Sequence, residues 1–220
     1  MANLGALAQQ LKDRFEVPFG IREFDSRDRF ASGLADIDRL LQGGFPRAAL
    51  SEITGSASSN RTALTVSILA RAFETGECGA WIDGSGTFDP ESAAEAGLQL
   101  NRLLWINCKS NPEHAVKATD LLLHGGGFGL IVFDVGDIPE SVVRRMPMAS
   151  WFRLRLAAEK TGTALIALTP APQTRSCSAV CVELRRRKFI WRGRLLQGIA
   201  SLLETRQHNS SKQVSFESVL

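Results

Sequence analysis

The chain has 220 residues, of which 44% are hydrophobic and 22% charged, a composition typical of a globular domain with an ordinary core. Its formal net charge of +3 is mild, so nucleic-acid binding is compatible with the composition but not required by it. No apolar run reaches the roughly 20 residues that span a bilayer, and the start of the chain is too polar for a secretory signal, so we expect a cytoplasmic protein without a membrane partner.

The cysteines and histidines form no pattern that predicts a disulfide or a metal centre. The cysteines follow no CxxC spacing and lie in apolar stretches, at Cys78, Cys108, Cys177 and Cys181. Because cytosolic disulfides are rare, we expect buried free thiols. The histidines are scattered, at His114, His124 and His208. A metal site needs a tighter cluster of ligands than this.

The first segment of the chain predicts a short helix. Apolar residues recur at helical spacing across residues 4–15, and a charged connector from Arg22 to Arg29 follows. We therefore assign residues 1–25 to an N-terminal helix and connector and residues 26–220 to the core domain.

From residue 49 onwards, short apolar segments alternate with amphipathic ones, as in a parallel α/β sheet. The predicted strands are 49–54, 80–83, 103–107, 130–134 and 164–168. The predicted helices are 62–75, 90–97, 112–124 and 140–160. The last helix must be interrupted near Pro147, because proline lacks the N–H that a helix interior needs. After Pro170 the helical period disappears, and 178–191, 198–205 and 212–220 predict an antiparallel extension of the sheet.

A degenerate phosphate-binding motif lies between the first predicted strand and the helix that follows. The stretch Gly55-Ser56-Ala57-Ser58-Ser59-Asn60-Arg61-Thr62 matches Gly-x-x-x-x-Gly-Lys-Ser/Thr at its first and last residues. Asn60 replaces the second glycine, which is tolerable because Asn adopts left-handed conformations more easily than most residues. Arg61 replaces the lysine with a planar fork, which is not a conservative change. Alone, the motif does not distinguish a phosphate loop from an unrelated Asn-Arg-Thr helix start.

The strand 130–134 ends in an acid, Asp134, at the place where a Mg²⁺-binding aspartate follows a phosphate loop. An acid that merely ends a strand would look the same, but the two features together favour a nucleotide site. The predicted nucleotide ligands are Gly55, Ser58, Ser59, Asn60, Arg61, Thr62 and Asp134. Within this set, Thr62 and Asp134 would hold Mg²⁺ beside ATP.

The order of these features resembles the RecA family of recombination ATPases over almost the whole chain. The matching segments are 31–41 with 43–47, 52–55, 81–83 with 88–90, 130–134, 202–206 and 212–220. The resemblance implies a RecA-like phosphate-loop fold, with a mainly parallel central sheet flanked by helices and a C-terminal antiparallel extension.

Departures from the family pattern predict that ATP hydrolysis is lost and that no residue is catalytic. Ser85 stands where the family has the glutamate that activates water, and a serine without a basic partner is no general base near neutral pH. The strand 164–168 is followed by Thr169-Pro170 in place of a polar sensor, and the next loop shrinks to residues 171–178. We also expect no C-terminal DNA-gathering domain.

Basic residues gather after Asp134 and again beyond residue 184. The candidates for contact with DNA are Arg144, Arg145, Arg153 and Arg175. The resemblance places them near the DNA-facing loops, where they would give salt-dependent, sequence-independent binding. Trp151 or Phe152 would stack on bases or else pack in the core. The run 185–188, with Arg192 and Arg194, would contact DNA or a protein, or protect an exposed strand edge.

The pattern is similar to that of RecA-like accessory proteins such as ImuA, which accompany translesion DNA synthesis. It favours an interaction protein of DNA repair and the SOS response that binds RecA or an error-prone polymerase, with residues 4–15 available for self-association. Two alternatives remain: a RecA-type DNA-dependent ATPase that uses Arg61, and a single-stranded-DNA-binding module without nucleotide.

Overall fold

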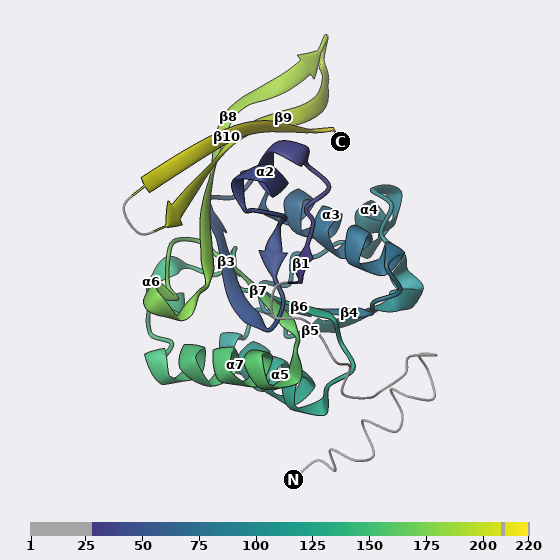
Figure 1. Cartoon of the computed structure of the whole chain (residues 1–220). Coiled ribbons are helices and arrows are strands. Elements are labelled where there is room, and N and C mark those ends of the chain that lie inside the picture. Colours follow the sequence, from purple (N-terminus) through teal and green to yellow (C-terminus); the bar gives the residue numbers. More distant parts are fainter. Residues whose placement is uncertain (1–27, 208–209, 220) are drawn as a thin grey trace.

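The computed structural model describes residues 28–207 and 210–219 (Figure 1). The helix predicted at residues 4–15, and the self-association assigned to it, lie outside the described residues. Within the described ranges, no helix combines the length and the apolar character that crossing a membrane requires.

An eight-stranded sheet forms the centre of the fold, in the order β10-β9-β8-β3-β7-β6-β4-β5. The parallel strands are β3 (Ala49–Gly55), β4 (Gly79–Asp83), β5 (Leu103–Asn107), β6 (Leu130–Asp134), β7 (Ala164–Thr169) and β8 (Val180–Arg192). The strands β9 (Leu195–Gln207) and β10 (Ser210–Val219) continue the sheet in antiparallel pairing. The predicted α/β class, with its antiparallel C-terminal extension, is confirmed.

Helices cover both faces of the parallel strands (Figure 1). In β6, Leu130 and Val132 belong to the core shared with α3 (Arg61–Glu74). Ile131 and Phe133 belong to the core shared with α5 (Pro112–Gly125) and α7 (Met148–Thr161). Because alternate side chains enter opposite cores, the strand is a continuous apolar run in the sequence.

The remaining elements are short. They are β1 (Arg29–Phe30), α2 (Ala35–Leu40), β2 (Phe45–Pro46), α4 (Pro90–Glu95), η1 (Leu100–Arg102), α6 (Glu140–Val143) and η2 (Arg175–Cys177). The predicted break at Pro147 separates α6 from α7. The prediction missed β1 and β2, because two residues are too few to show a period, and it also missed the six-residue helix α2.

The carboxyl ends of the parallel strands lie at one edge of the sheet. Asp83 on β4 is in register with Asp134 on β6, and Thr54 on β3 with Thr169 on β7. The loops that follow β3, β4, β6 and β7 therefore meet at this edge, which is where open α/β sheets bind their ligands.

The four cysteines are free, as predicted, although Cys181 is only half-buried. Burial raises the pKa of the Cys78, Cys108 and Cys177 thiols above the usual value. Among the described residues, no group of three or more His, Cys, Asp or Glu side chains could hold a metal ion.

Candidate functional site

The predicted phosphate loop connects the end of β3 to the start of α3. Ser58 and Asn60 have positive φ angles of 58° and 69°. Asn60 thus adopts the left-handed conformation at the position where the motif has glycine. Arg61 opens α3 and is buried, whereas Thr62 beside it is exposed.

The side chain of Asn60 ties the loop to the C-terminal strands. Its Nδ2 donates to the carbonyl oxygen of Ile199 at 2.9 Å and to Ser201 Oγ at 3.0 Å, both on β9. Its Oδ1 accepts a hydrogen bond from Ser218 Oγ on β10 at 2.8 Å. Since a glycine would form none of these bonds, the departure from the motif adds contacts to the sheet extension.

The guanidinium of Arg61 points into the protein, and the residue is 6% exposed. Nη1 donates to the carbonyl oxygens of Gly136 at 2.6 Å and Thr169 at 3.1 Å. Nη2 donates to Asp137 Oδ1 at 2.7 Å. We call these three hydrogen bonds the Arg61 clamp. They join the start of α3 to the loop after β6 and to the end of β7.

Asp134 and Ser85 face each other at the same edge of the sheet. Asp134 Oδ1 accepts hydrogen bonds from Gly136 N at 2.9 Å and Ser85 Oγ at 3.4 Å, and Asp137 N donates to Ser85 Oγ at 3.1 Å. Ser85 therefore links Asp134 to the loop after β6. In the part of the chain that the structure describes, no hydrogen bond joins Asp134 to Thr62, its predicted partner in Mg²⁺ binding.

Burial raises the pKa of Asp134 from near 3.8 to about 6, the Gly136 N–H lowers it and Asp83 raises it. The folded-state pKa lies above the unfolded one, so this contribution to stability is present below about pH 4 and is lost as the pH rises through about 6. By about pH 7.5 the free energy of unfolding is therefore lower by roughly 3 kcal/mol than it would be if Asp134 stayed protonated.

Asp134→Asn removes this titration and keeps an oxygen for Gly136 N. We expect the variant to be more stable than the wild type near neutral pH, and the difference to disappear towards about pH 4. Urea unfolding across this pH range measures the difference in the free energy of unfolding between variant and wild type. Asp36→Asn, at an exposed position, is the control. A difference that is constant with pH would contradict the raised pKa.

The side chain of Thr169, at the end of β7 where the family pattern has a polar sensor, points to Glu52 and not to the phosphate loop. Glu52, on β3, is fully buried. Its carboxylate accepts from Cys181 Sγ at 3.7 Å and from four donors at the end of β7 and in the loop after it. The donors are Thr169 Oγ1 at 2.8 Å, Gln173 N at 2.8 Å, Thr174 N at 3.2 Å and Thr174 Oγ1 at 2.6 Å. Glu52 thus fixes the shortened loop after β7. Glu52 was not among the predicted site residues. The signal for it in the sequence was an acidic residue inside a strand that is buried on both faces.

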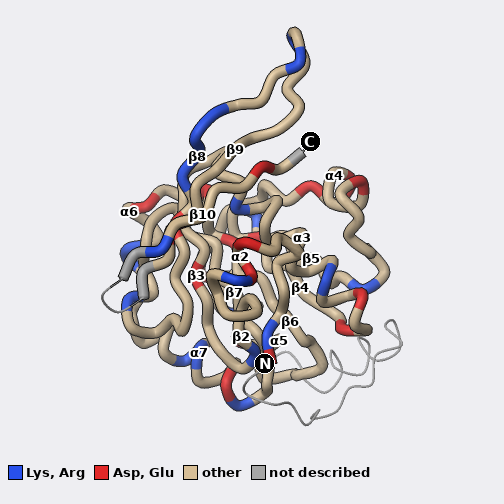
Figure 2. Tube along the Cα trace, turned by 45° about the horizontal axis from the view of Figure 1, so that its top comes forward, with Lys and Arg blue, Asp and Glu red and all other residues tan. Residues whose placement is uncertain are grey.

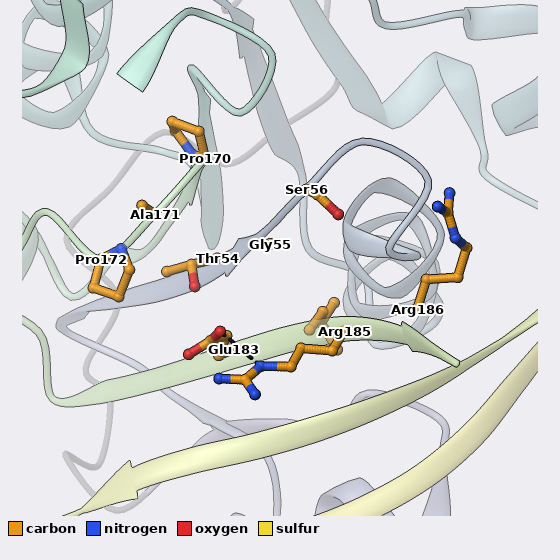
Figure 3. A pocket seen from close by; sticks show the side chains of 10 residues that line it. Thr54, Gly55, Ser56, Pro170, Ala171, Pro172, Glu183, Arg185 and Arg186 are labelled. Carbon is orange, nitrogen blue, oxygen red and sulfur yellow. Dashed lines mark hydrogen bonds and ion pairs between the residues drawn. The ribbon is translucent and has the colours of Figure 1, made fainter. Parts of the chain in front are cut away.

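A pocket of ≈ 310 Å³ lies on the other side of the loop, towards β8. Its walls come from Thr54–Ser56, Pro170–Pro172 and residues 183–186, and they include neither Arg61 nor Asp134. Figure 3 shows Arg185 turned to Glu183, while Arg186 points the other way. Of the predicted nucleotide ligands, only Gly55 lines this pocket.

The four arginines predicted to contact DNA lie on and around α6, α7 and η2. Two are in ion pairs: Arg144 with Glu140 at 2.6 Å, and Arg153 with Asp120 at 3.1 Å. The other two, at positions 145 and 175, are exposed. An arginine that is already paired with a carboxylate gains less from a phosphate, so the DNA contacts stay a prediction.

The two aromatic residues of α7 have different surroundings. Trp151 is 1% exposed and packs edge-on against Phe133, with ring centroids 5.6 Å apart. Of the two alternatives for Trp151, packing in the core is therefore confirmed and stacking on bases is excluded. Phe152, one residue on, is 41% exposed.

The hairpin of β8 and β9 projects beyond the body of the sheet (Figure 1). β8 pairs with β3 only as far as Leu184, and β10 pairs with β9 only from Gly198. We call the projecting residues, 185–197, the arm. Its exposed apolar side chains are Phe189, Trp191 and Leu195. The Phe189 and Trp191 ring centroids lie 6.3 Å apart, and the Arg186 guanidinium lies 4.5 Å above Phe189.

The arm contains six basic residues and no acidic one. Arg185 is paired with Glu183 and Glu204 at its base. Figure 2 shows Lys and Arg in blue along the projecting hairpin. The other cations are Arg186, Arg187, Lys188, Arg192 and Arg194, and in the described ranges none of them has a carboxylate partner. The edge of β8 is open beyond Leu184, so these charges also discourage pairing with another strand, as the edge-protection alternative supposed.

The loop after β3, the acid ending β6 and the strand order define an α/β domain of the phosphate-loop class. The family model of the RecA N-terminal domain matches residues 16–149. The chain therefore belongs to the RecA family.

Individual relatives agree with this assignment. The chain is 32% identical over 137 residues to Protein RecA of Methylococcus capsulatus, covering 60% of this chain and 39% of that protein. It is 32% identical over 166 residues to Protein RecA of Rickettsia canadensis, covering 72% and 46%. It thus spans less than half the length of these relatives. Its fold is similar to that of the RadB recombinase, with a TM-score of 0.65 at 18% identity, over 85% of this chain and 94% of that one.

Proposed function

We propose that this protein is a RecA-like accessory protein of DNA repair that acts through protein partners and does not hydrolyse ATP. The observation that carries the proposal is the Arg61 clamp. A guanidinium held by Gly136, Asp137 and Thr169 is not free to serve a phosphoryl group during transfer. In addition, Ser85 supplies no carboxylate that could activate water.

The partners that fit this role are RecA or an error-prone polymerase, in cytoplasmic translesion synthesis during the SOS response. The arm supports a role in protein contact, because Trp and Arg dominate the binding energy of interfaces, and Trp191 and several arginines are exposed on it. The projecting hairpin also leaves both of its faces accessible to a partner.

ATP turnover by the full chain, with and without single-stranded DNA, tests the proposal. We expect turnover no faster than that of Asp134→Ala in either condition. DNA-stimulated turnover that Asp134→Ala abolishes would instead identify the alternative, a RecA-type DNA-dependent ATPase.

Single-stranded DNA binding is a second candidate function, and the arm favours it. Its unpaired cations would displace counterions from a phosphate backbone, and Phe189 and Trp191 offer aromatic faces to bases. We expect Trp191→Ala to weaken the binding of a labelled oligothymidylate roughly tenfold, because stacking contributes about 1–3 kcal/mol per base.

Fluorescence anisotropy over a salt series measures this affinity. Arg39→Ala, which removes an exposed cation paired with Asp36 and outside the predicted DNA contacts, is the control and should bind nearly as well as the wild type. An equal loss in both variants would move the DNA site away from the arm, and no binding at low salt would eliminate this candidate.

A further inference from the structure

We infer that Arg61 is a built-in substitute for the nucleotide, and that its guanidinium joins the strand ends so that the fold closes without a bound ligand. The inference rests on the proposed function, because it supposes that the loop no longer serves catalysis.

The Arg61 clamp joins the segments that a nucleotide joins in a working phosphate-loop enzyme. There, the loop and its lysine contact the phosphates, and the acid after a neighbouring strand holds the Mg²⁺ that bridges them. Here, one side chain connects the start of α3 with the loop after β6 and the end of β7. The connection is made by hydrogen bonds within the protein, and Arg61 is almost fully buried.

The acceptors are divided between the two terminal nitrogens of the guanidinium, whereas an ammonium group would have to reach all of them from one nitrogen. Two carbonyl oxygens and one carboxylate oxygen surround a planar fork that has several fixed donors. The clamp extends further, because Asp137 also accepts from Thr87 Oγ1 at 3.3 Å and its N–H donates to Ser85 Oγ. A glutamate at position 85 would add a carboxylate beside Asp134, whereas serine donates to Asp134.

Gly136 makes room for the clamp. A Cβ at this position would lie 2.4 Å from Arg61 Nη1 and 2.8 Å from Arg61 Cζ. The backbone of Gly136 does not have a left-handed φ, so the glycine is not required by its own conformation. The close contact with Arg61 is therefore what favours glycine at position 136, and a substitution at either position changes the same contact.

The residues predicted to hold Mg²⁺ and ATP do not fit them in this arrangement. Asp134 Oδ1 is engaged by Gly136 N and Ser85 Oγ, and Thr62 has no hydrogen bond to Asp134 among the described residues. To reach a phosphate, Arg61 would have to leave the carbonyl oxygens of two buried residues, Gly136 and Thr169, without their donor and give up the ion pair with Asp137.

Thermal unfolding of the full chain, with and without millimolar Mg-ATP, tests the inference. Arg61→Lys removes the guanidinium, and Gly136→Ala places a Cβ in the space that the guanidinium occupies. Each is expected to lower Tm by about 5–10 °C. The double variant should fall by clearly less than the sum, because both changes remove the same contact. Arg71→Lys, on the exposed side of α3, is the control and should leave Tm nearly unchanged. Mg-ATP should not raise the Tm of the wild type.

A wild-type Tm that rises with Mg-ATP would overturn the inference, because the nucleotide would then bind in place of the clamp. An unchanged Tm in Arg61→Lys, or fully additive shifts in the double variant, would overturn it as well. These results are distinct from failure of the proposed function, which would appear as DNA-stimulated ATP turnover.

Discussion

Glu52→Ala is expected to lower the free energy of unfolding by about 3–5 kcal/mol, because four donors at the end of β7 and in the loop after it lose their acceptor inside the protein. Urea denaturation measures the change. The loop after β7 should also become more accessible, which limited proteolysis within residues 170–178 would detect.

Glu74→Ala is the matched control, since Glu74 is an exposed acid paired only with Arg71 one turn away on the surface of α3. It should cost about 0–1 kcal/mol. If Glu52→Ala cost no more than Glu74→Ala, the carboxylate would not be what fixes this loop.

Asn60→Gly is expected to destabilise the protein by about 2–3 kcal/mol, although it restores the glycine of the motif. Glycine adopts the left-handed conformation without strain, so the loss reports the hydrogen bonds to Ile199, Ser201 and Ser218 together with the greater backbone freedom that glycine loses on folding. Because two of these partners lie on β9 and one on β10, hydrogen exchange in β10 should accelerate more than in β6.

Asn60→Ala separates the contribution of the side-chain hydrogen bonds from that of the left-handed backbone conformation. It removes the same hydrogen bonds and adds about 1 kcal/mol of left-handed strain, so it should be the less stable variant. A glycine variant as stable as the wild type would mean that the Asn60 side chain does not hold the loop to the sheet extension.

The departures from the family pattern are connected through contacts. Arg61 reaches Asp137, Asp137 N donates to Ser85, and Ser85 donates to Asp134. The side chain of Asn60 forms hydrogen bonds with other strands of the sheet, β9 and β10. Residues that bind and hydrolyse a nucleotide in the family pattern here hold the ends of the strands together.

Much of the fold could be predicted from the sequence. Segments such as 130–134 and 164–168 are apolar throughout because each strand is covered on both faces, and Pro147 marked the break between two helices. The pattern also brought the loop and Asp134 to the same edge of the sheet. It failed for the two-residue strands β1 and β2, which are too short to show a period, and for the short helix α2.

The direction of the loop side chains could not be predicted in this way. An arginine in the lysine position predicts a phosphate ligand, and its true partners depend on Gly136, Asp137 and Thr169, which are 75 to 108 residues away in the chain. Trp151 was ambiguous for a similar reason. On a helix, only the tertiary packing decides which of two adjacent aromatic residues faces the core.

Calorimetric titration of the 220-residue chain with Mg-ATP tests the central claim most directly, because it measures binding whether or not hydrolysis follows. With the Arg61 clamp in place, we expect no saturable heat at millimolar nucleotide. A saturable one-site isotherm that Asp134→Ala abolishes would contradict the claim, since the loop would then still be a nucleotide site.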